Sequence, residues 1–154
     1  MTKKGFRDFS GNDYTFDEFL ETCKKLDSLG YKFSVGTDSQ VRKQSVDVVT
    51  CICAHAYGIG SKVFYQKHSL DARDFPTLRS RLLHETYSSI EMAIQLEGVV
   101  KGKLGVHLDV GKTKRSSSNK YCSELEIIVR SQGYECTTKP DSFATACADK
   151  KVRD

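Results

Sequence analysis

The feature that most constrains the fold is a pair of β-rich segments joined by a glycine turn. Residues 46–57 and 61–68 are rich in β-branched and aromatic residues and are separated by Gly58-Ile59-Gly60, so we expect an antiparallel hairpin. A further strand is expected before the hairpin, over residues 31–38. After the hairpin, helix and strand patterns alternate along the chain. This order predicts one mixed sheet with helices packed on it.

Helix signals flank the expected strands. Thr15 and Glu18 fit a capping box, and apolar residues then recur at helical spacing as far as Gly30. Pro76 is expected to open a long helix that runs to about Glu97. The other expected elements are strands over 104–110 and 134–139, a helix over 119–132, and a short final helix capped by Asp141.

Length and composition favour a single folded domain. The chain has 154 residues, of which 38% are hydrophobic, and this is enough to bury a core. Residues 1–13 are polar and are expected to be a flexible lead-in, so that the domain covers 14–154. The apolar runs are too short to span a membrane. The six cysteines form no C-x-x-C pair and no signal peptide is evident, so we expect reduced thiols and a cytoplasmic protein.

Two aspartates are expected to end two strands. Asp38 lies in the segment GTDSQ (36–40) and Asp109 in VHLDV (106–110). If these strands are parallel neighbours, the two carboxylates lie about 4.8 Å apart and repel each other unless they are protonated or bridged by a cation. A divalent metal resolves this conflict, and the spacing approximates the roughly 3.5–4 Å between the ions of two-metal phosphoryl-transfer sites. The alternative is that each aspartate simply begins a turn.

The long helix and the last helix offer further carboxylates. At about 100° per residue, Glu85 falls beside the apolar stripe that includes Leu82, whereas Glu91 points to the exposed face. Glu85 is therefore either part of an acidic site or a boundary residue that reaches water. Spacing leaves two alternatives for a fourth acid, Asp149 and Asp141, the second of which would instead cap the last helix.

A basic, serine-rich stretch follows Asp109. Its cations are Lys112, Lys114, Arg115 and Lys120. A charge run is usually a solvated loop, and the formal net charge of +4 permits a polyanionic partner without requiring one. The position of this stretch at the same sheet end as the acids favours contact with a nucleic-acid backbone. His107 shares a strand face with Asp109 and is interpreted as a buried structural histidine.

Five segments carry a family resemblance. They are GTDSQ (36–40), RLLHE (81–85), VHLDVG (106–111), SNKYCSELE (118–126) and KPDSFATACADK (139–150). In this order they resemble the YkuK-like family of ribonuclease H-fold proteins. The resemblance implies an α/β ribonuclease H-like fold with a five-stranded mixed sheet in the order 3-2-1-4-5, counted along the chain, and helices on both faces. Strands one and four are then neighbours.

The resemblance also implies an acidic metal site. Asp38, Glu85 and Asp109 match its first three acids by position, and Asp149 matches the acid of the last helix better than Asp141. The resulting hypothesis is a metal-dependent nuclease that binds two Mg²⁺ or Mn²⁺ ions and acts on RNA, DNA or a hybrid. Two other classes stay open because a fold alone does not fix a function. These are a nucleic-acid-binding module that does not cleave, and a protein-interaction scaffold with structural acids.

Overall fold

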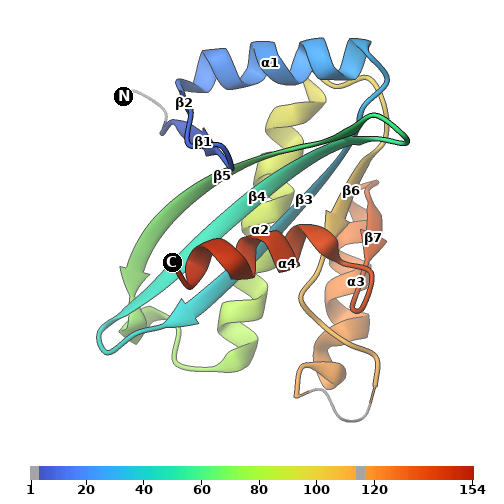
Figure 1. Cartoon of the computed structure of the whole chain (residues 1–154). Coiled ribbons are helices and arrows are strands. Elements are labelled where there is room, and N and C mark those ends of the chain that lie inside the picture. Colours follow the sequence, from blue (N-terminus) through green and yellow to red (C-terminus); the bar gives the residue numbers. More distant parts are fainter. Residues whose placement is uncertain (1–3, 114–116) are drawn as a thin grey trace.

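The computed structural model describes residues 4–113 and 117–154, which form one sheet and the helices packed on it (Figure 1). The strands are β1 (Phe6–Asp8), β2 (Asp13–Tyr14), β3 (Lys32–Val41), β4 (Ser45–Ala56), β5 (Gly60–Asp71), β6 (Leu104–His107) and β7 (Glu135–Thr137). The helices are α1 (Phe16–Ser28), α2 (Leu78–Glu97), α3 (Cys122–Ser131) and α4 (Phe143–Val152), with 3₁₀ turns η1 (Ala72–Asp74) and η2 (Asn119–Tyr121).

The strand order in the sheet is β2-β1-β5-β4-β3-β6-β7. Strands β3, β4 and β5 are joined by antiparallel pairing, whereas β6 runs parallel to β3 and β7 parallel to β6. The five strands from β5 to β7 reproduce the 3-2-1-4-5 order that the family resemblance implied. The first long strand and the strand after α2 are therefore parallel neighbours, as the argument about the two aspartates required.

The expected count of five strands is wrong, because the N-terminal residues add two more to the sheet. β1 pairs with β5 and β2 pairs with β1, where we had expected residues 1–13 to form a flexible lead-in. Phe6 accounts for the difference. Its side chain is buried and its ring stacks on that of Phe19 in α1, with centroids 3.7 Å apart. Burying a phenylalanine stabilises this segment against the sheet.

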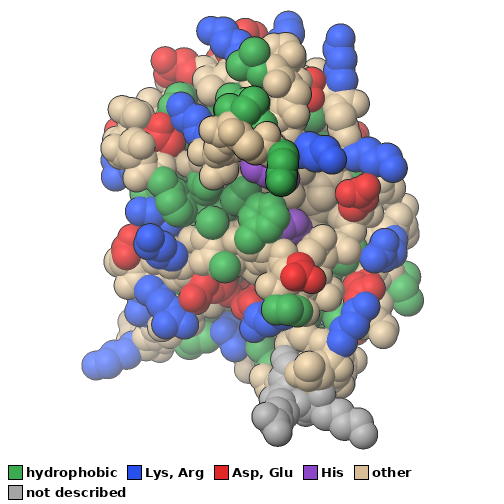
Figure 2. Space-filling view, turned by 45° about the vertical axis from the view of Figure 1, so that its right-hand side comes forward, with side chains coloured by type: hydrophobic (Ala, Val, Ile, Leu, Met, Phe, Trp, Pro, Cys, Tyr) green, Lys and Arg blue, Asp and Glu red, His purple; other side chains and the backbone are tan. Residues whose placement is uncertain are grey.

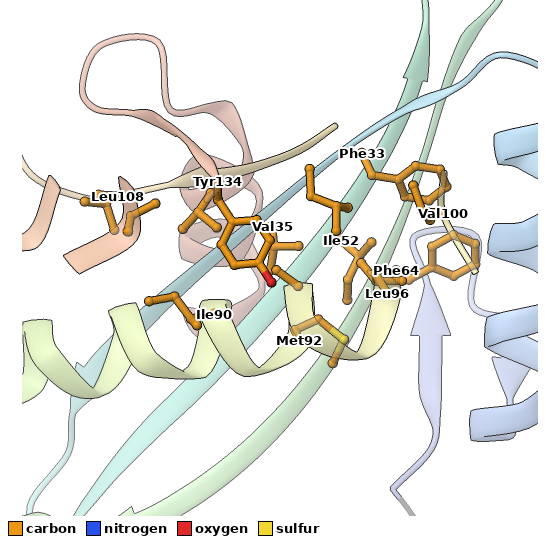
Figure 3. Packing of buried hydrophobic residues seen from close by; sticks show 14 of the residues in the cluster. Phe33, Val35, Ile52, Phe64, Ile90, Met92, Leu96, Val100, Leu108 and Tyr134 are labelled. Atoms are coloured by element: carbon orange, nitrogen blue, oxygen red, sulfur yellow. The ribbon is translucent and has the colours of Figure 1, made fainter. Parts of the chain in front are cut away.

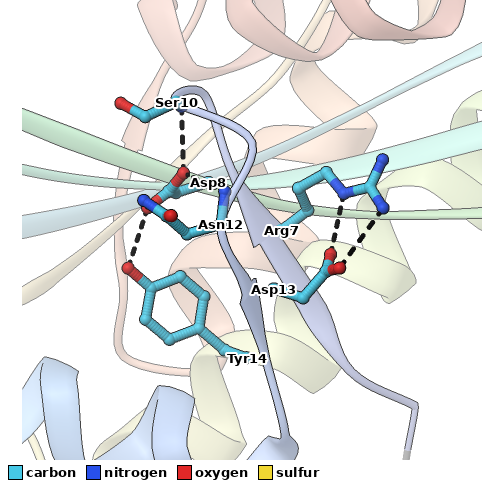
Figure 4. A network of polar contacts seen from close by, with 6 residues as sticks. All are labelled: Arg7, Asp8, Ser10, Asn12, Asp13 and Tyr14. Atoms are coloured by element: carbon cyan, nitrogen blue, oxygen red, sulfur yellow. Dashed lines mark hydrogen bonds and ion pairs between the residues drawn. The ribbon is translucent and has the colours of Figure 1, made fainter.

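A polar network fixes the turn between β1 and β2 (Figure 4). The buried carboxylate of Asp8 accepts hydrogen bonds from the backbone N–H groups of Ser10 and Asn12, from the Asn12 amide and from the Tyr14 hydroxyl. Burial acts to raise the pKa of Asp8, but these hydrogen bonds outweigh it and lower the pKa to about 2. The turn therefore depends on an ionised carboxylate.

The main core lies between the sheet and the helices α1, α2 and α3. Phe19 of α1, Leu96 of α2 and Leu125 of α3 belong to one buried cluster with Phe33 and Val35 of β3, and Figure 3 shows α2 lying across this layer. The alternation of side chains along β3 explains the cluster, because its odd-numbered residues face these helices.

The helix α4 covers the other face of the sheet. Its residues Ala148 and Val152 pack against Val49 and Cys51 of β4. Gly36 permits a close approach, since a Cβ there would lie 2.6 Å from the backbone nitrogen of Thr145. Helices thus cover both faces, and no helix in the described part of the chain has the length and apolar character needed to cross a membrane.

The start of α4 differs from the sequence expectation. The N-cap residue is Ser142, and Asp141 is exposed and precedes the cap. The expectation that Asp141 caps this helix is therefore wrong. His107 of β6 helps to fix the helix start instead, because its Nδ1 accepts a hydrogen bond of 3.1 Å from the backbone N–H of Ala144. His107 is buried, as expected for a structural histidine.

Two of the strand ends that differ from the sequence expectation matter for the site. β6 ends at His107 rather than at Val110, and β3 continues to Val41 rather than ending at Asp38. β3 continues because β4 pairs with it along its full length, up to the pair of Val41 and Val46. On its other side, β3 pairs with β6 only as far as Gly36. The sheet is therefore open beside β3 beyond Gly36.

Candidate carboxylate site

Asp38 and Asp109 lie at the same level of two neighbouring parallel strands. In the register of β3 and β6, Gly36 is opposite His107, and each aspartate follows two residues later. Asp38 is a buried residue within β3, 6% exposed, whereas Asp109 lies in the loop that leaves β6. The parallel pairing thus brings the two predicted aspartates together at the carboxyl end of β6.

Glu85 approaches this position from α2. It is 7% exposed and lies on the face of α2 that packs on the sheet, whereas Glu91 is exposed, as the helical spacing predicted. The Ser39 hydroxyl donates a hydrogen bond to the Glu85 carboxylate. Burial is the largest cause that raises the pKa of Glu85, to about 8, and the charge of Asp109 adds to it while the Ser39 bond opposes it.

Asp149 of α4 is the fourth acid at this position. Burial, the negative charges of Glu85 and Asp109, and hydrogen bonds with the carboxyls of Asp149 and Asp109 together raise the pKa of Asp38 to about 9. The exposed Asp141 does not contribute to this effect. The four residues whose carboxyls interact around β3, namely Asp38, Glu85, Asp109 and Asp149, are called the acidic cluster below.

Two cations neutralise the outer members of the acidic cluster. Lys139 Nζ lies 3.0 Å from Asp109 Oδ1, and Arg153 Nε lies 3.0 Å from Asp149 Oδ1. The side chains of Asp109 and Asp149 are 28% and 44% exposed, respectively. With these ion pairs in place, no three His, Cys, Asp or Glu side chains form a metal-binding group among the residues that the structure describes.

Comparison with known proteins places this geometry in a family. The Ribonuclease H-like family matches residues 15–153, which is most of the chain. The chain belongs to the ribonuclease H-like family. The YkuK protein of Bacillus subtilis (strain 168), described as uncharacterized, is 28% identical over 158 residues that cover 90% of each chain. No solved structure matches the chain significantly. The family resemblance seen in the sequence motifs is thereby confirmed.

The basic stretch of this ribonuclease H-like chain is only partly described. Lys112 is 68% exposed and lies 3.2 Å from Glu126 of α3, and the Lys120 ammonium lies 5.1 Å from the centre of the Tyr121 ring. Lys114 and Arg115 lie outside the described residues. The ion pair of Lys112 shows that at least one cation of the basic stretch already interacts with an acid of the domain.

Three further residues support the acidic cluster and were not singled out from the sequence. They are Ser39, Lys139 and Arg153. Ser39 follows Asp38 directly, and strand alternation places it on the α2 side, where it meets Glu85. That signal was available in the sequence. No such sequence signal existed for Lys139 and Arg153, because their contacts depend on how the last helix and the loop before it are packed.

The donor chemistry of the acidic cluster fits a hard divalent cation. Carboxylate oxygens are the ligands that Mg²⁺ and related ions prefer. Buried acids that raise one another's pKa gain most from a positive charge placed between them. The neighbouring Lys139 and Arg153 are half or more exposed, and exposed ion pairs contribute only about 0–1 kcal/mol. Separating these two cations from the carboxylates would therefore cost little.

Proposed function

We propose that this ribonuclease H-like protein is a metal-dependent nuclease that hydrolyses phosphodiester bonds at the acidic cluster. The observation that carries the proposal is the electrostatic coupling around Asp38, whose pKa is raised by burial and by three other carboxyls that come from separate elements of the fold. Perturbed carboxyls that converge in this way are typical of functional sites. A purely structural role gives no reason to bury two repelling acids.

The proposed ligands are the four acids of the acidic cluster, and the proposed cofactor is a pair of Mg²⁺ or Mn²⁺ ions. Bound divalent ions neutralise phosphate charge and activate water for attack on phosphorus. Asp38 is held rigidly within β3, and Glu85 is held by its hydrogen bond from Ser39. The more exposed Asp109 and Asp149 lie where a substrate arrives from solvent.

Cations around the acidic cluster support a nucleic-acid substrate. Once a divalent ion satisfies Asp109 and Asp149, Lys139 and Arg153 are released to meet phosphate oxygens. Lys112 and Lys120 belong to the basic stretch that follows Asp109 in the sequence, as do Lys114 and Arg115, which lie outside the described residues. Such contacts act on the backbone and not on base identity, so the proposal covers RNA, DNA and their hybrid.

The test uses two glutamates of the same helix. We would incubate the purified chain with labelled RNA, DNA and hybrid duplexes, with Mg²⁺, with Mn²⁺ and with a chelator. Cleavage should require metal, should be lost in Glu85→Gln, and should persist in the matched control Glu91→Gln, which changes an exposed acid on the opposite face of α2.

Two results would count against a nuclease. Cleavage that survives chelation, or that Glu85→Gln and Glu91→Gln retain equally, would remove the acidic cluster from the chemistry. Binding of nucleic acid without cleavage under any metal condition would favour the non-catalytic module.

A further inference from the structure

A second concave region lies at the other end of the sheet. It is a cavity of about 1180 Å³ lined by the first residues of β3, by the loop between α2 and β6, and by the start of α4. Ser34 in its wall precedes Asp38 by four residues of extended strand, which is about 13 Å. Figure 2 shows histidine side chains in a hollow between hydrophobic and basic side chains. The cavity also reaches His107, two residues before Asp109, but none of the four acids of the acidic cluster lines it.

Two histidines line the cavity, and one of them has a ring N–H group available to a ligand. His107 Nδ1 accepts the backbone N–H of Ala144, so the ring proton must be on Nε2. That N–H donor has no acceptor within the described residues. The Nδ1 atom of His55 is buried and has no hydrogen-bond partner in the described part of the chain. Because this atom is buried, a ligand in the cavity does not reach it, and the Nε2–H group of His107 is the available donor.

An aromatic wall stands beside these histidines. Phe143, the first residue of α4, is 43% exposed and lines the cavity. Its ring centre lies 4.4 Å from that of His107 and 5.4 Å from that of His55, with nearly perpendicular planes. The perpendicular packing holds the Phe143 ring in place. A planar heteroaromatic ligand can therefore stack on this ring while its edge meets the Nε2–H group of His107.

The rim carries charges of both signs. Four lysines and four acids line the cavity. Three of the acids are already used by the fold. Asp27 accepts the backbone N–H groups of residues 101 and 102, Glu97 accepts the Tyr134 hydroxyl, and Glu135 lies 3.8 Å from Lys103.

The lysines are less committed than the acids. Lys24, Lys32 and Lys101 have no ion pair within the described residues, and all three are exposed. Lysine ammonium groups of this kind bind phosphate as point charges. The cavity therefore combines an aromatic wall, polar atoms at its floor and available cations at its rim.

We propose that this cavity binds a nucleotide, with its base stacked on Phe143, the base edge paired with His107, and its phosphate held by the rim lysines. A free mononucleotide and an unpaired nucleotide of a longer strand share this chemistry. The inference does not depend on the nuclease proposal, because none of these residues belongs to the acidic cluster.

The test is a calorimetric titration of the full chain in the presence of a chelator. The probes are AMP, GMP, CMP and UMP, the matching nucleosides, and a short single-stranded oligonucleotide. At least one monophosphate should bind, and more tightly than its nucleoside. Phe143→Leu should weaken this binding about fivefold or more, and Lys101→Gln should also weaken it. The matched control Lys43→Gln, in an exposed turn elsewhere, should bind like the parent.

The outcomes separate the two sources of the ligand and the two proposals. If the oligonucleotide displaces the monophosphate, the cavity holds part of a strand; if it does not, the ligand is a free nucleotide. Asp38→Asn should bind nucleotide normally, so loss of the nuclease site leaves this result unchanged. Failure of every probe to bind, or binding that both Phe143→Leu and Lys101→Gln leave intact, would overturn the proposal. A melting curve checks that each variant is folded, and Lys101→Gln, in an exposed loop, decides the matter if Phe143→Leu unfolds.

Discussion

Replacing Glu85 by glutamine should stabilise the metal-free protein, and the gain should depend on pH. Burial raises the pKa of Glu85 from its ordinary value of 4.5 to about 8. The folded state therefore keeps a proton that the unfolded state releases, and the parent protein loses stability as the pH rises from 4.5 to 8. Glutamine keeps the shape and can accept the Ser39 hydrogen bond, but it does not titrate.

The structure also sets the size of this effect. At pH 7, the pH lies above the ordinary glutamate pKa of 4.5. This difference corresponds to a gain of at most about 3 kcal/mol in the free energy of unfolding of Glu85→Gln over the parent. Near pH 4 both side chains are neutral in both states, so the difference in free energy of unfolding should be close to zero. Between these limits the gain should grow steadily with pH.

The assay is urea unfolding in a chelating buffer at several pH values from 4 to about 7.5, the range where the linkage operates. Glu91→Gln is the matched control because Glu91 is exposed on the same helix, and it should change stability little at any pH. A gain that is the same at every pH, or a loss of stability for Glu85→Gln at neutral pH, would refute the argument that Glu85 is a buried, uncompensated acid.

Three further predictions concern the stability of the fold. Asp8→Asn should cost about 2 kcal/mol at neutral pH, and because the pKa of Asp8 is lowered to about 2, the difference should disappear as the pH falls from 4 towards 2 in unfolding titrations. Gly36→Ala should cost about 1–3 kcal/mol by calorimetry, since its Cβ would lie 2.6 Å from Thr145, whereas Gly98→Ala, with its nearest atom at 3.8 Å, should cost little. Phe6→Ala should cost about 3–5 kcal/mol in denaturant unfolding, and an unchanged midpoint would mean that β1 does not stabilise the domain.

Several elements could be predicted from the sequence because local signals and periodicity agreed in them. The capping box of Thr15 and Glu18 is present, and helical spacing correctly distinguished Glu85 from Glu91. Strand alternation correctly placed Asp38 on the face of β3 opposite to the one that packs on α1, α2 and α3. The family motifs then supplied the strand order, which periodicity alone does not contain.

Other features could not be predicted because they depend on tertiary contacts. The residues around Phe6 are polar and did not predict a strand. A strand forms there because the ring of Phe6 packs on α1. The ion pairs of Lys139 and Arg153 require the folded path of the last helix and the loop before it. Likewise, Asp141 followed a proline and resembled a helix cap, but the chain places Ser142 there.

The most direct test of the central claim is the thermal shift that Mn²⁺ gives the protein and its variants. Four proteins are compared with and without Mn²⁺: the parent, Asp38→Asn, Asp109→Asn and the double variant. Mn²⁺ should raise the melting temperature of the parent, because a ligand that binds only the folded state stabilises it. Each single variant should lose this shift while keeping or gaining stability without metal, and the double variant should differ little from either, since the two acids act as a unit. If a variant keeps the full Mn²⁺ shift, or if the parent shows none, the acidic cluster is not a metal site.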